Sequence, residues 1–267
     1  MKIGGLVVLY KPNNQMLENV IKISNYVDNL VIVDNSEDNI DYFENADNII
    51  YKKMDNNVGL AKAFNVGFTF FIDNCFDWVV YFDQDTNIDD KMKKNYFDKI
   101  EYKSNVAVYT PQYEIDRKKK PILTEEFANV KWTMTSASIF NVKIFSKIGG
   151  FDERYFLDVV DYEYCLKAIK NGFLIVKYCG YSFKHCPGIT KESKILKYKY
   201  GYMSPLRFYY QIRNLKLLKS EYSYWKIRLI IVMKYIKVIL FFDSKSEFFK
   251  MGKKAKRDFK AKKFGKF

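Results

Sequence analysis

The sequence Trp78-Val79-Val80-Tyr81-Phe82-Asp83-Gln84-Asp85 joins an apolar, aromatic run to two aspartates separated by one residue. The run predicts a buried strand, and side chains two residues apart on extended backbone point the same way. We therefore expect the carboxylates of Asp83 and Asp85 to face one spot beyond the strand's carboxyl end, with Gln84 turned aside. Open α/β sheets bind ligands at that edge. Two hard oxygen ligands suit Mg²⁺ or Mn²⁺ held partly by substrate phosphates, whereas an isolated Asp-x-Asp is more often a simple acidic turn.

Short apolar runs and helical stretches alternate around this motif. Strands are expected at 3–10, 30–33 and 49–51, and helices at 16–26 and 60–72. This alternation predicts βαβ units and a mainly parallel sheet with right-handed crossovers. Neither GxGxxG nor GxxxxGK[ST] occurs in the sequence. A nucleotide-binding fold of this kind must therefore hold phosphates through a metal rather than through a glycine-rich loop.

A second acidic cluster opens the helix that we expect over residues 158–171. Asp158, Asp161 and Glu163 stand within six residues, beside aromatic side chains. Asp158 suits the N-cap, and Asp161 is placed as in a capping box, where carboxylates also favour the positive end of the helix dipole. A carboxylate at a helix N-terminus is held ionised, as a base needs. A catalytic base must in addition reach the proton that it removes.

Length and composition limit the class of protein. A chain of 267 residues that is 48% hydrophobic is long enough for one domain plus an appendage. One histidine and four cysteines without a CxxC pair support neither a structural zinc site nor a disulfide framework. A reduced, cytosolic setting fits best, and the apolar start is better explained as a first strand than as a signal peptide.

Charge divides the chain into two parts. Residues 1–190 carry 23 Lys/Arg against 26 Asp/Glu, whereas residues 191–267 carry 22 against 5. The apolar stretch 225–242 contains four cations, too many for a spanning helix of ~20 mostly uncharged residues. We expect a helix lying in an anionic membrane interface, followed by a polybasic end from 245 to 266. The alternative is a core-packing helix with a solvated basic tail.

Several motifs, taken in order, resemble the inverting glycosyltransferases of family 2, which have the GT-A fold, and most of all the bacterial rhamnosyltransferases. The resembling segments are Leu9-Tyr10, Asp34-Asn35-Ser36, the alternating pattern from Asn57 to Gly67, Phe82-Asp83-Gln84-Asp85, Gly149-Gly150-Phe151-Asp152-Glu153 and the stretch from Phe156 to Leu166. The resemblance covers roughly residues 3–215. Two positions depart from the usual family pattern: Val160 precedes Asp161 where the family usually has Glu, and Lys167 stands where arginine is frequent. Gln211-Ile212-Arg213-Asn214 is only a partial echo of the motif of processive synthases, which favours addition of a single sugar.

The resemblance implies a GT-A domain over residues 1–215, a Rossmann-like mixed sheet flanked by helices, and a basic helical extension over 216–267. It implies that Asp161 deprotonates the acceptor hydroxyl and that Asp85, assisted by Asp83, holds Mn²⁺ or Mg²⁺, with His185 as a further ligand of the metal or of the diphosphate. The expected donor-binding residues are Leu9, Tyr10, Asp34, Asn35, Asn57, Lys62, Asp83 and Gln84. The expected acceptor-binding residues are Trp132, Ser136 and Asp158.

Four of these residues have a simpler structural explanation. Asp34 is alternatively a turn residue that ends a strand, Lys62 an exposed helix residue, His185 a structural histidine and Trp132 a core residue. The preferred donor is dTDP-rhamnose, ahead of UDP-galactofuranose, UDP-hexose and N-acetylhexosamine donors. The expected acceptor is a saccharide or a lipid-linked saccharide at the cytoplasmic face of the cell membrane, where the protein would be peripheral.

Two other classes of protein fit parts of the sequence. A sugar nucleotidyltransferase shares the α/β core and metal carboxylates, but usually has a glycine-rich basic loop after the first strand, where Lys11-Pro12-Asn13-Asn14 stands here. Nucleic-acid binding is suggested by the pI of about 9.3 and the many aromatics. The acidic first 190 residues argue against a nucleic-acid partner, because they would place carboxylates near the polymer.

Overall fold

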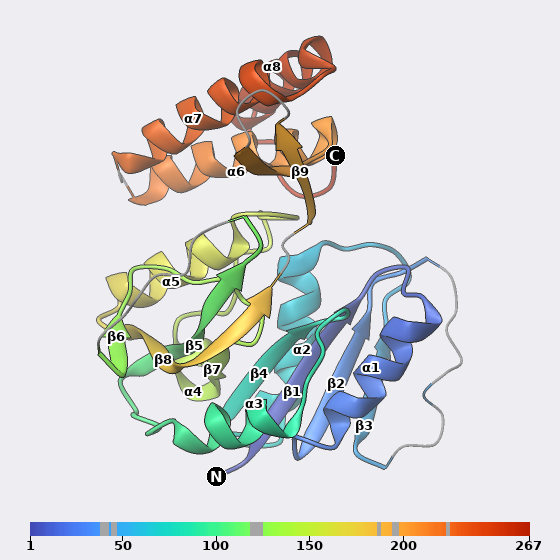
Figure 1. The fold of residues 1–267 in the computed structure, drawn as a ribbon, viewed down its shortest axis with the longest axis vertical. Helices are drawn as coiled ribbons and strands as arrows, with labels where there is room; N and C mark the ends of the chain where they lie inside the picture. The colour runs from blue at the N-terminus through green and yellow to red at the C-terminus, as the bar shows by residue number, and fades with distance from the viewer. Residues whose placement is uncertain (38–42, 44–46, 118–124, 186–187, 194–197, 223–224) are drawn as a thin grey trace. The chain divides into compact units, whose positions relative to one another are not determined.

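The computed structural model describes residues 1–37, 43, 47–117, 125–185, 188–193, 198–222 and 225–267. The chain forms two compact units, the first made of Met1–Gln112, Leu123–Glu153 and Val160–Phe183, the second of Tyr113–Ile122, Arg154–Val159 and Lys184–Phe267. Figure 1 labels the elements along the chain. Up to the fourth strand they are β1 (Ile3–Leu9), α1 (Asn14–Ser24), β2 (Asn29–Asp34), β3 (Ile49–Lys53), α2 (Leu60–Asp73) and β4 (Trp78–Asp83).

The next elements complete the sheet of the first unit, and the last ones belong to the second. They are α3 (Asp90–Asn95), the 3-10 helix η1 (Phe97–Lys99), β5 (Val106–Ile115), β6 (Phe127–Asn129), β7 (Ile139–Asn141), α4 (Val142–Lys147), α5 (Val160–Lys170) and β8 (Leu174–His185). They are followed by β9 (Ile189–Ser193), β10 (Tyr198–Tyr202), α6 (Pro205–Tyr222), α7 (Lys226–Phe241) and α8 (Lys245–Lys260).

An eight-stranded mixed sheet organises the first unit. Its order is β3-β2-β1-β4-β7-β5-β8-β6, and β3, β2, β1 and β4 run parallel. The four expected strands and the α/β class are confirmed. Because β1 lies between β2 and β4, the chain order reverses there, which makes a topological switch point. In register, Leu9 stands opposite Asp34 and Val8 opposite Asp83, so the polar residues that end these strands meet at one edge.

Helix α2 packs closely on the parallel strands because a glycine faces them. A Cβ atom at Gly67 would lie 2.3 Å from Cδ1 of the buried Leu6 in β1, so a methyl group there would require Leu6 to move. On the same helix the Phe64 ring lies 4.5 Å from the ring of Tyr81, and the Phe68 ring stacks on Phe145 at 3.7 Å. The alternating pattern that begins at Asn57 therefore gives this helix its glycine contact and its aromatic packing.

The helix that carries most of the second acidic cluster starts later than expected. Helix α5 begins at Val160 instead of Asp158, and the N-cap expected at Asp158 is wrong. Asp158 and Val159 both have left-handed backbone, with φ of +60° and +69°. An N-cap has extended backbone, and left-handed φ is rare for a β-branched residue such as Val159.

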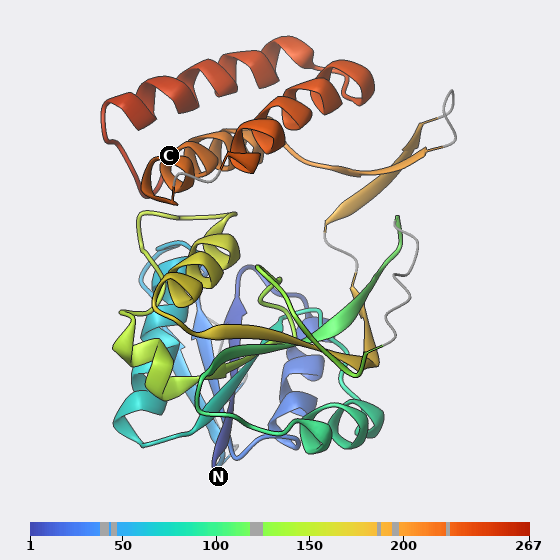
Figure 2. The same ribbon diagram turned by 90° about the vertical axis from the view of Figure 1, so that its left-hand side faces the viewer.

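The second unit consists largely of α6, α7 and α8, with the two-stranded sheet of β9 and β10 (Figure 2). Its core includes Phe208 and Ile212 of α6, Val238 of α7, and Phe248 and Ala255 of α8. The boundary that we expected after residue 215 falls within α6. Among the helices that the structure describes, none is both long enough and apolar enough to cross a membrane.

Candidate active site

The edge where β1, β2 and β4 end is held together by side chains that bind backbone groups. Gln84 binds the backbone of Tyr10 twice: its Oε1 accepts from the Tyr10 N–H at 2.8 Å and its Nε2 donates to the Tyr10 carbonyl at 3.3 Å. The N–H of Asn35 donates to the carbonyl of buried Leu9 at 2.8 Å. Gln84 thus joins the end of β4 to that of β1, while Asp83 is the last residue of β4 and Asp85 follows the strand.

Asp83 and Asp85 both act on the hydroxyl of Tyr81. That hydroxyl donates to Asp83 Oδ1 at 3.0 Å. Burial, and then the nearby carboxylates of Asp83 and Asp85, raise the pKa of Tyr81 well above its ordinary value. Asp83 is half-buried and Asp85 is exposed. The two carboxylates are therefore close to one buried phenol at the switch point.

This pair of carboxylates fits a divalent cation that takes its remaining ligands from substrate and water. Within the described ranges no group of three or more His, Cys, Asp or Glu could hold a metal ion. Mg²⁺ and similar hard ions commonly bind through one or two carboxylates plus substrate phosphates. Asp83 and Asp85 would hold such an ion. His185 ends β8 in the second unit, where its ring lies 6.0 Å from that of Tyr113, and its place among the ligands stays a prediction.

The expected donor residues at the end of β2 bind protein groups. Asp34 is fully buried, and its carboxylate accepts from the Tyr51 hydroxyl at 2.5 Å and from the Ser36 N–H at 2.9 Å. Asn35 donates to Asn57 Oδ1 at 3.1 Å. These bonds match the turn-forming explanation of Asp34, and the direct donor contacts of Asp34 and Asn35 stay predictions.

Asn57 shapes the start of α2. Its Oδ1 accepts from the N–H of Gly59 at 3.0 Å, and Gly59 has the left-handed φ of +89° at the N-cap of the helix. Lys62 is exposed on the first turn, and Tyr10 is 44% exposed at the end of β1. Solvent therefore reaches Tyr10, Lys62 and Asp85, and these side chains are open to a ligand.

Asp161 lies in the first turn of α5 and faces a small hollow. Its Oδ1 accepts from the Tyr162 N–H at 2.9 Å. The hollow is lined by Thr133, Met134, Thr135, Phe140, Phe151, Asp161, Tyr164 and Cys165. Asp161 is half-buried, so its carboxylate is shielded from bulk water in part and still reaches the surface.

An exposed tryptophan packs on Tyr162, the residue after Asp161. The indole of Trp132 is 47% exposed and stacks on Tyr162 with ring centroids 4.5 Å apart and an interplanar angle of 17°. Burial raises the pKa of the nearby Cys165 thiol to about 12, and a backbone hydrogen bond from Thr133 opposes that rise. Trp132 is thus a surface residue and not a core residue, whereas Ser136 is buried, with 2% of its surface exposed.

A continuous set of contacts joins the two carboxylate groups. The segment that lines the hollow at Thr135 continues to Ala137, whose N–H donates to the Tyr81 carbonyl at 2.8 Å, and the Tyr81 N–H donates to the Ser138 carbonyl at 3.0 Å. The side chain of Tyr81 in turn binds Asp83. The Asp83–Asp85 pair and Asp161 therefore both belong to the first unit and are linked through one strand and one loop.

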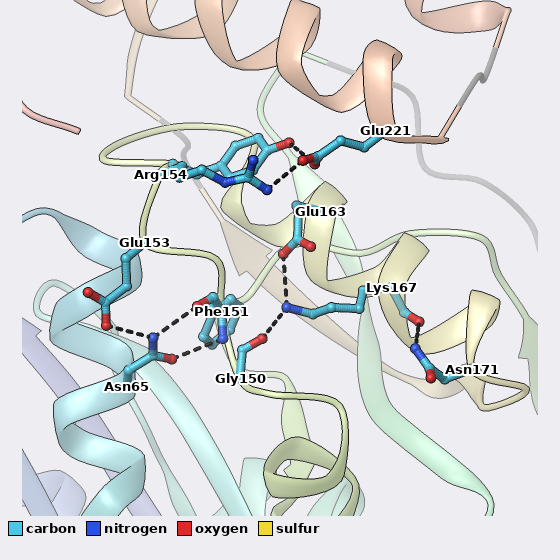
Figure 3. A network of polar contacts seen from close by, with 10 residues as sticks. Asn65, Gly150, Phe151, Glu153, Arg154, Glu163, Lys167, Asn171 and Glu221 are labelled. Carbon is cyan, nitrogen blue, oxygen red and sulfur yellow. Dashed lines mark hydrogen bonds and ion pairs between the residues drawn. The ribbon is translucent and has the colours of Figure 1, made fainter. Parts of the chain in front are cut away.

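Asn65 and Lys167, which the sequence did not single out as functional, hold the Gly150–Glu153 segment (Figure 3). Asn65 Nδ2 donates to the Phe151 carbonyl at 2.9 Å and to Glu153 at 3.1 Å, and its Oδ1 accepts from the Phe151 N–H at 2.9 Å. Lys167 donates to the Gly150 carbonyl and pairs with Glu163 at 3.4 Å. Lys167, which stands where the family often has arginine, therefore joins the Gly150–Glu153 segment to Glu163 of its own helix.

Asn65→Ala is expected to lower the free energy of unfolding by about 1–3 kcal/mol, since it leaves the Phe151 amide and carbonyl without their partner. Chemical denaturation measures the change. Thr69→Ala on the same helix removes an exposed hydroxyl that donates to the Asn65 carbonyl at 3.0 Å and serves as the control. Equal stability of the Asn65 variant and this control would contradict the proposed clamp.

Asp158 binds within the second unit. Its carboxylate accepts from Nε of Arg207 at 2.9 Å and from Nη2 at 2.9 Å, a bidentate pair. Asn214 Nδ2 donates to the carbonyls of Leu157 and Asp158 at 2.8 and 3.0 Å. These bonds hold the left-handed turn of Asp158 and Val159, and the acceptor-binding role of Asp158 stays a prediction.

Comparison with known proteins places these features in a family. The model of Glycosyl transferase family 2 matches residues 14–157. The dTDP-rhamnosyl transferase RfbF of Shigella flexneri is 29% identical over 178 residues, which cover 61% of this chain and 60% of that protein. The chain thus spans less than two thirds of the length of this relative.

Two solved structures share the fold at low sequence identity. S. aureus TarS matches with a TM-score of 0.53 and 16% identity over 87% of this chain and 43% of that chain. GalNAc-T7, solved with UDP, GalNAc and Mn²⁺, matches with a TM-score of 0.56 and 11% identity over 98% of this chain and 56% of that chain. The expected GT-A fold is confirmed. Because the family model covers more than half of the 267 residues, the chain belongs to glycosyl transferase family 2.

Proposed function

We propose that this protein is an inverting glycosyltransferase that moves one sugar from a nucleotide-diphospho-sugar to a hydroxyl group of a saccharide. The observation that supports it most is the linked pair of acidic sites in the first unit. Asp83 and Asp85 stand at the switch point where α/β sheets bind ligands, and the Asp161 hollow is lined by the loop that pairs with Tyr81. Asp83 and Asp85 suit a cation that binds the donor diphosphate, and Asp161 suits the hydroxyl of the acceptor.

Asp161 acts as the base in the proposed reaction. Its carboxylate takes the proton of the acceptor hydroxyl, the acceptor oxygen forms a bond to the anomeric carbon, and the bond from that carbon to the diphosphate oxygen breaks on the opposite side. A divalent cation at Asp83 and Asp85, when bound, neutralises charge on the departing phosphate. Tyr81 keeps Asp83 in place and, because its pKa is raised, stays protonated as the donor of that hydrogen bond.

The donor that we propose is dTDP-rhamnose. The support is the resemblance of the motifs and the similarity to a relative named dTDP-rhamnosyl transferase. A thermal-shift panel of dTDP, UDP and GDP with Mn²⁺ tests it, because a ligand that binds the native state raises its stability. The proposal expects the largest shift with dTDP, and a larger shift with UDP or GDP would reject this donor.

For the acceptor, we propose that the exposed indole of Trp132 provides a flat surface for a sugar ring next to Asp161. Trp132→Ala is expected to raise KM for the acceptor about three- to tenfold, on the scale of one aromatic contact, with KM for the donor unchanged. Steady-state kinetics with each substrate varied separately measures both constants.

Trp132→Phe keeps an aromatic face above Tyr162 and is the matched control, expected to stay within about twofold of the native KM. A rise in donor KM instead of acceptor KM would reject the acceptor role.

We further propose that the acceptor saccharide is lipid-linked, at the cytoplasmic face of the cell membrane, in the synthesis of cell-surface polysaccharide. The basic charge of residues 191–267 supports this choice.

A further inference from the structure

The outward face of helix α7 is apolar. Seven large apolar side chains on the helix and at its start are exposed: Trp225 63%, Leu229 53%, Val232 52%, Met233 60%, Ile236 39%, Ile239 48% and Leu240 61%. They recur at spacings of three and four residues, which places them on one side of a helix. We call these seven residues the α7 face. Scattered exposed apolar residues are normal on a protein, but a continuous apolar stripe marks an interaction surface.

The inward side of the same helix holds two of its cations. Lys234 Nζ donates to Gln211 Oε1 and Lys237 Nζ donates to the Gly201 carbonyl. Burial lowers the pKa of Lys234 and lowers that of Lys237 to about 8. Helix α7 therefore turns two ammonium groups inward beside its buried Ile227 and Val238, and exposes the seven apolar side chains of the α7 face. The helix therefore contains polar residues, but Lys234 and Lys237 bond inside the unit and leave the outer face apolar.

Helix α8, which contacts α7 in the same unit, carries many exposed cations. The two helices lie side by side (Figure 2), and the Tyr235 ring of α7 contacts the Phe249 ring of α8 at 5.8 Å. A Cβ atom at Gly252 would lie 2.3 Å from the Tyr235 hydroxyl, so the helices approach closely there. The exposed cations of α8 are Lys245, Lys250, Lys253, Lys256, Arg257 and Lys260.

We propose that the α7 face lies on an anionic membrane surface, with its apolar side chains in the boundary between headgroups and acyl chains and the α8 cations at the lipid phosphates. An apolar helix face beside clustered Lys and Arg is the composition that binds such an interface. A second copy of this chain is the poorer occupant, because residues 191–267 carry 22 cations against 5 anions, and pairing two copies would oppose like charges. This inference extends the proposed function. It rests on the lipid-linked acceptor proposed above only to explain why the protein would bind a membrane.

Binding of the full chain to vesicles tests the inference without any sugar donor, so its failure is separate from failure of the transferase assignment. Sedimentation with vesicles of phosphatidylcholine and phosphatidylglycerol (7:3) compares the native protein with Leu229→Gln/Met233→Gln/Leu240→Gln. The variant is expected to bind at least tenfold more weakly. The matched control, Ile21→Gln/Ile169→Gln/Leu174→Gln, changes three exposed apolar residues of the first unit and is expected to bind as the native protein does.

Charge and apolar contact are separated by a second variant and by salt. Lys253→Gln/Lys256→Gln/Lys260→Gln is expected to weaken binding at low salt roughly fivefold per lysine, with a smaller difference at high salt because charges are screened. Trp225 fluorescence is expected to shift to the blue on addition of vesicles, and Trp225→Phe to remove that shift. Equal binding of the native protein and the Leu229 triple variant overturns the proposal, as does a native dimer that this variant abolishes while vesicle binding is unchanged.

Discussion

Asp161→Asn is expected to lower turnover by about 10²–10⁴-fold, the usual contribution of proton transfer to a positioned base. The amide has nearly the same shape but accepts no proton at neutral pH. The hydrogen bond that Asp161 Oδ1 accepts from the Tyr162 N–H is available to the amide oxygen of Asn, so helix α5 should keep its first turn. Product formation from a nucleotide sugar and an acceptor measures the loss.

The fold and the donor site provide the controls for this variant. Melting temperature, and the thermal shift caused by a nucleotide diphosphate with Mn²⁺, are both expected to match those of the native protein. Glu163→Gln changes the buried carboxylate two residues later, which pairs with Lys167, and is expected to reduce stability more than turnover. Near-native turnover of Asp161→Asn would remove this residue from the mechanism.

Asp85→Asn is expected to abolish the Mn²⁺-dependent part of the thermal shift with a nucleotide diphosphate. Turnover should fall by about 10²-fold or more, because a metal on a departing phosphate contributes several kcal/mol. Asp85 is exposed, and the Tyr81 hydroxyl donates its hydrogen bond to Asp83, so replacing Asp85 leaves the Tyr81–Asp83 bond intact. Titration of Mn²⁺ by calorimetry, with the nucleotide present, measures the loss of binding.

Two further variants make this result specific. Asp73→Asn replaces an exposed carboxylate at the end of α2 and is expected to bind metal and nucleotide as the native protein does. Tyr81→Phe removes the hydroxyl that binds Asp83 and is expected to weaken metal binding less than Asp85→Asn does. If Asp85→Asn kept a native metal dependence, the assignment of the ion to this pair would be wrong.

The parts of this molecule that depend on local pattern could be predicted from the sequence. Apolar runs gave the four parallel strands, and two aspartates after Phe82 indicated the edge where the strands end, because strand periodicity and the position of ligand sites in α/β sheets are general. The local pattern also places Asp161 in the first turn of a helix, whereas its role as the base follows from the resemblance to the family. These features need no knowledge of distant contacts.

The rest depends on contacts between residues far apart in the chain. The clamp of Asn65 on Phe151 spans 86 residues, and Asp158 meets Arg207 across 49 residues. The pairing with Arg207 and Asn214 holds Asp158 in left-handed backbone, which local propensity for an N-cap does not foresee. The inward turn of Lys234 depends likewise on Gln211 of another helix, so the apolar outer face of α7 emerges only in the folded unit.

The close fit of Gly67 against Leu6 has a consequence for engineering this enzyme. Helix α2 begins after Gly59 and carries Asn65, which bonds to Phe151, about one and a half turns later. Because Gly67 has no side chain, the helix packs closely on Leu6 of β1. If a redesign for another nucleotide sugar tilted helix α2, it would also displace the Phe151 segment. Loop grafts at 54–56, which leave Asn57 and its bond to the Gly59 N–H in place, are therefore the safer starting point for changing donor choice.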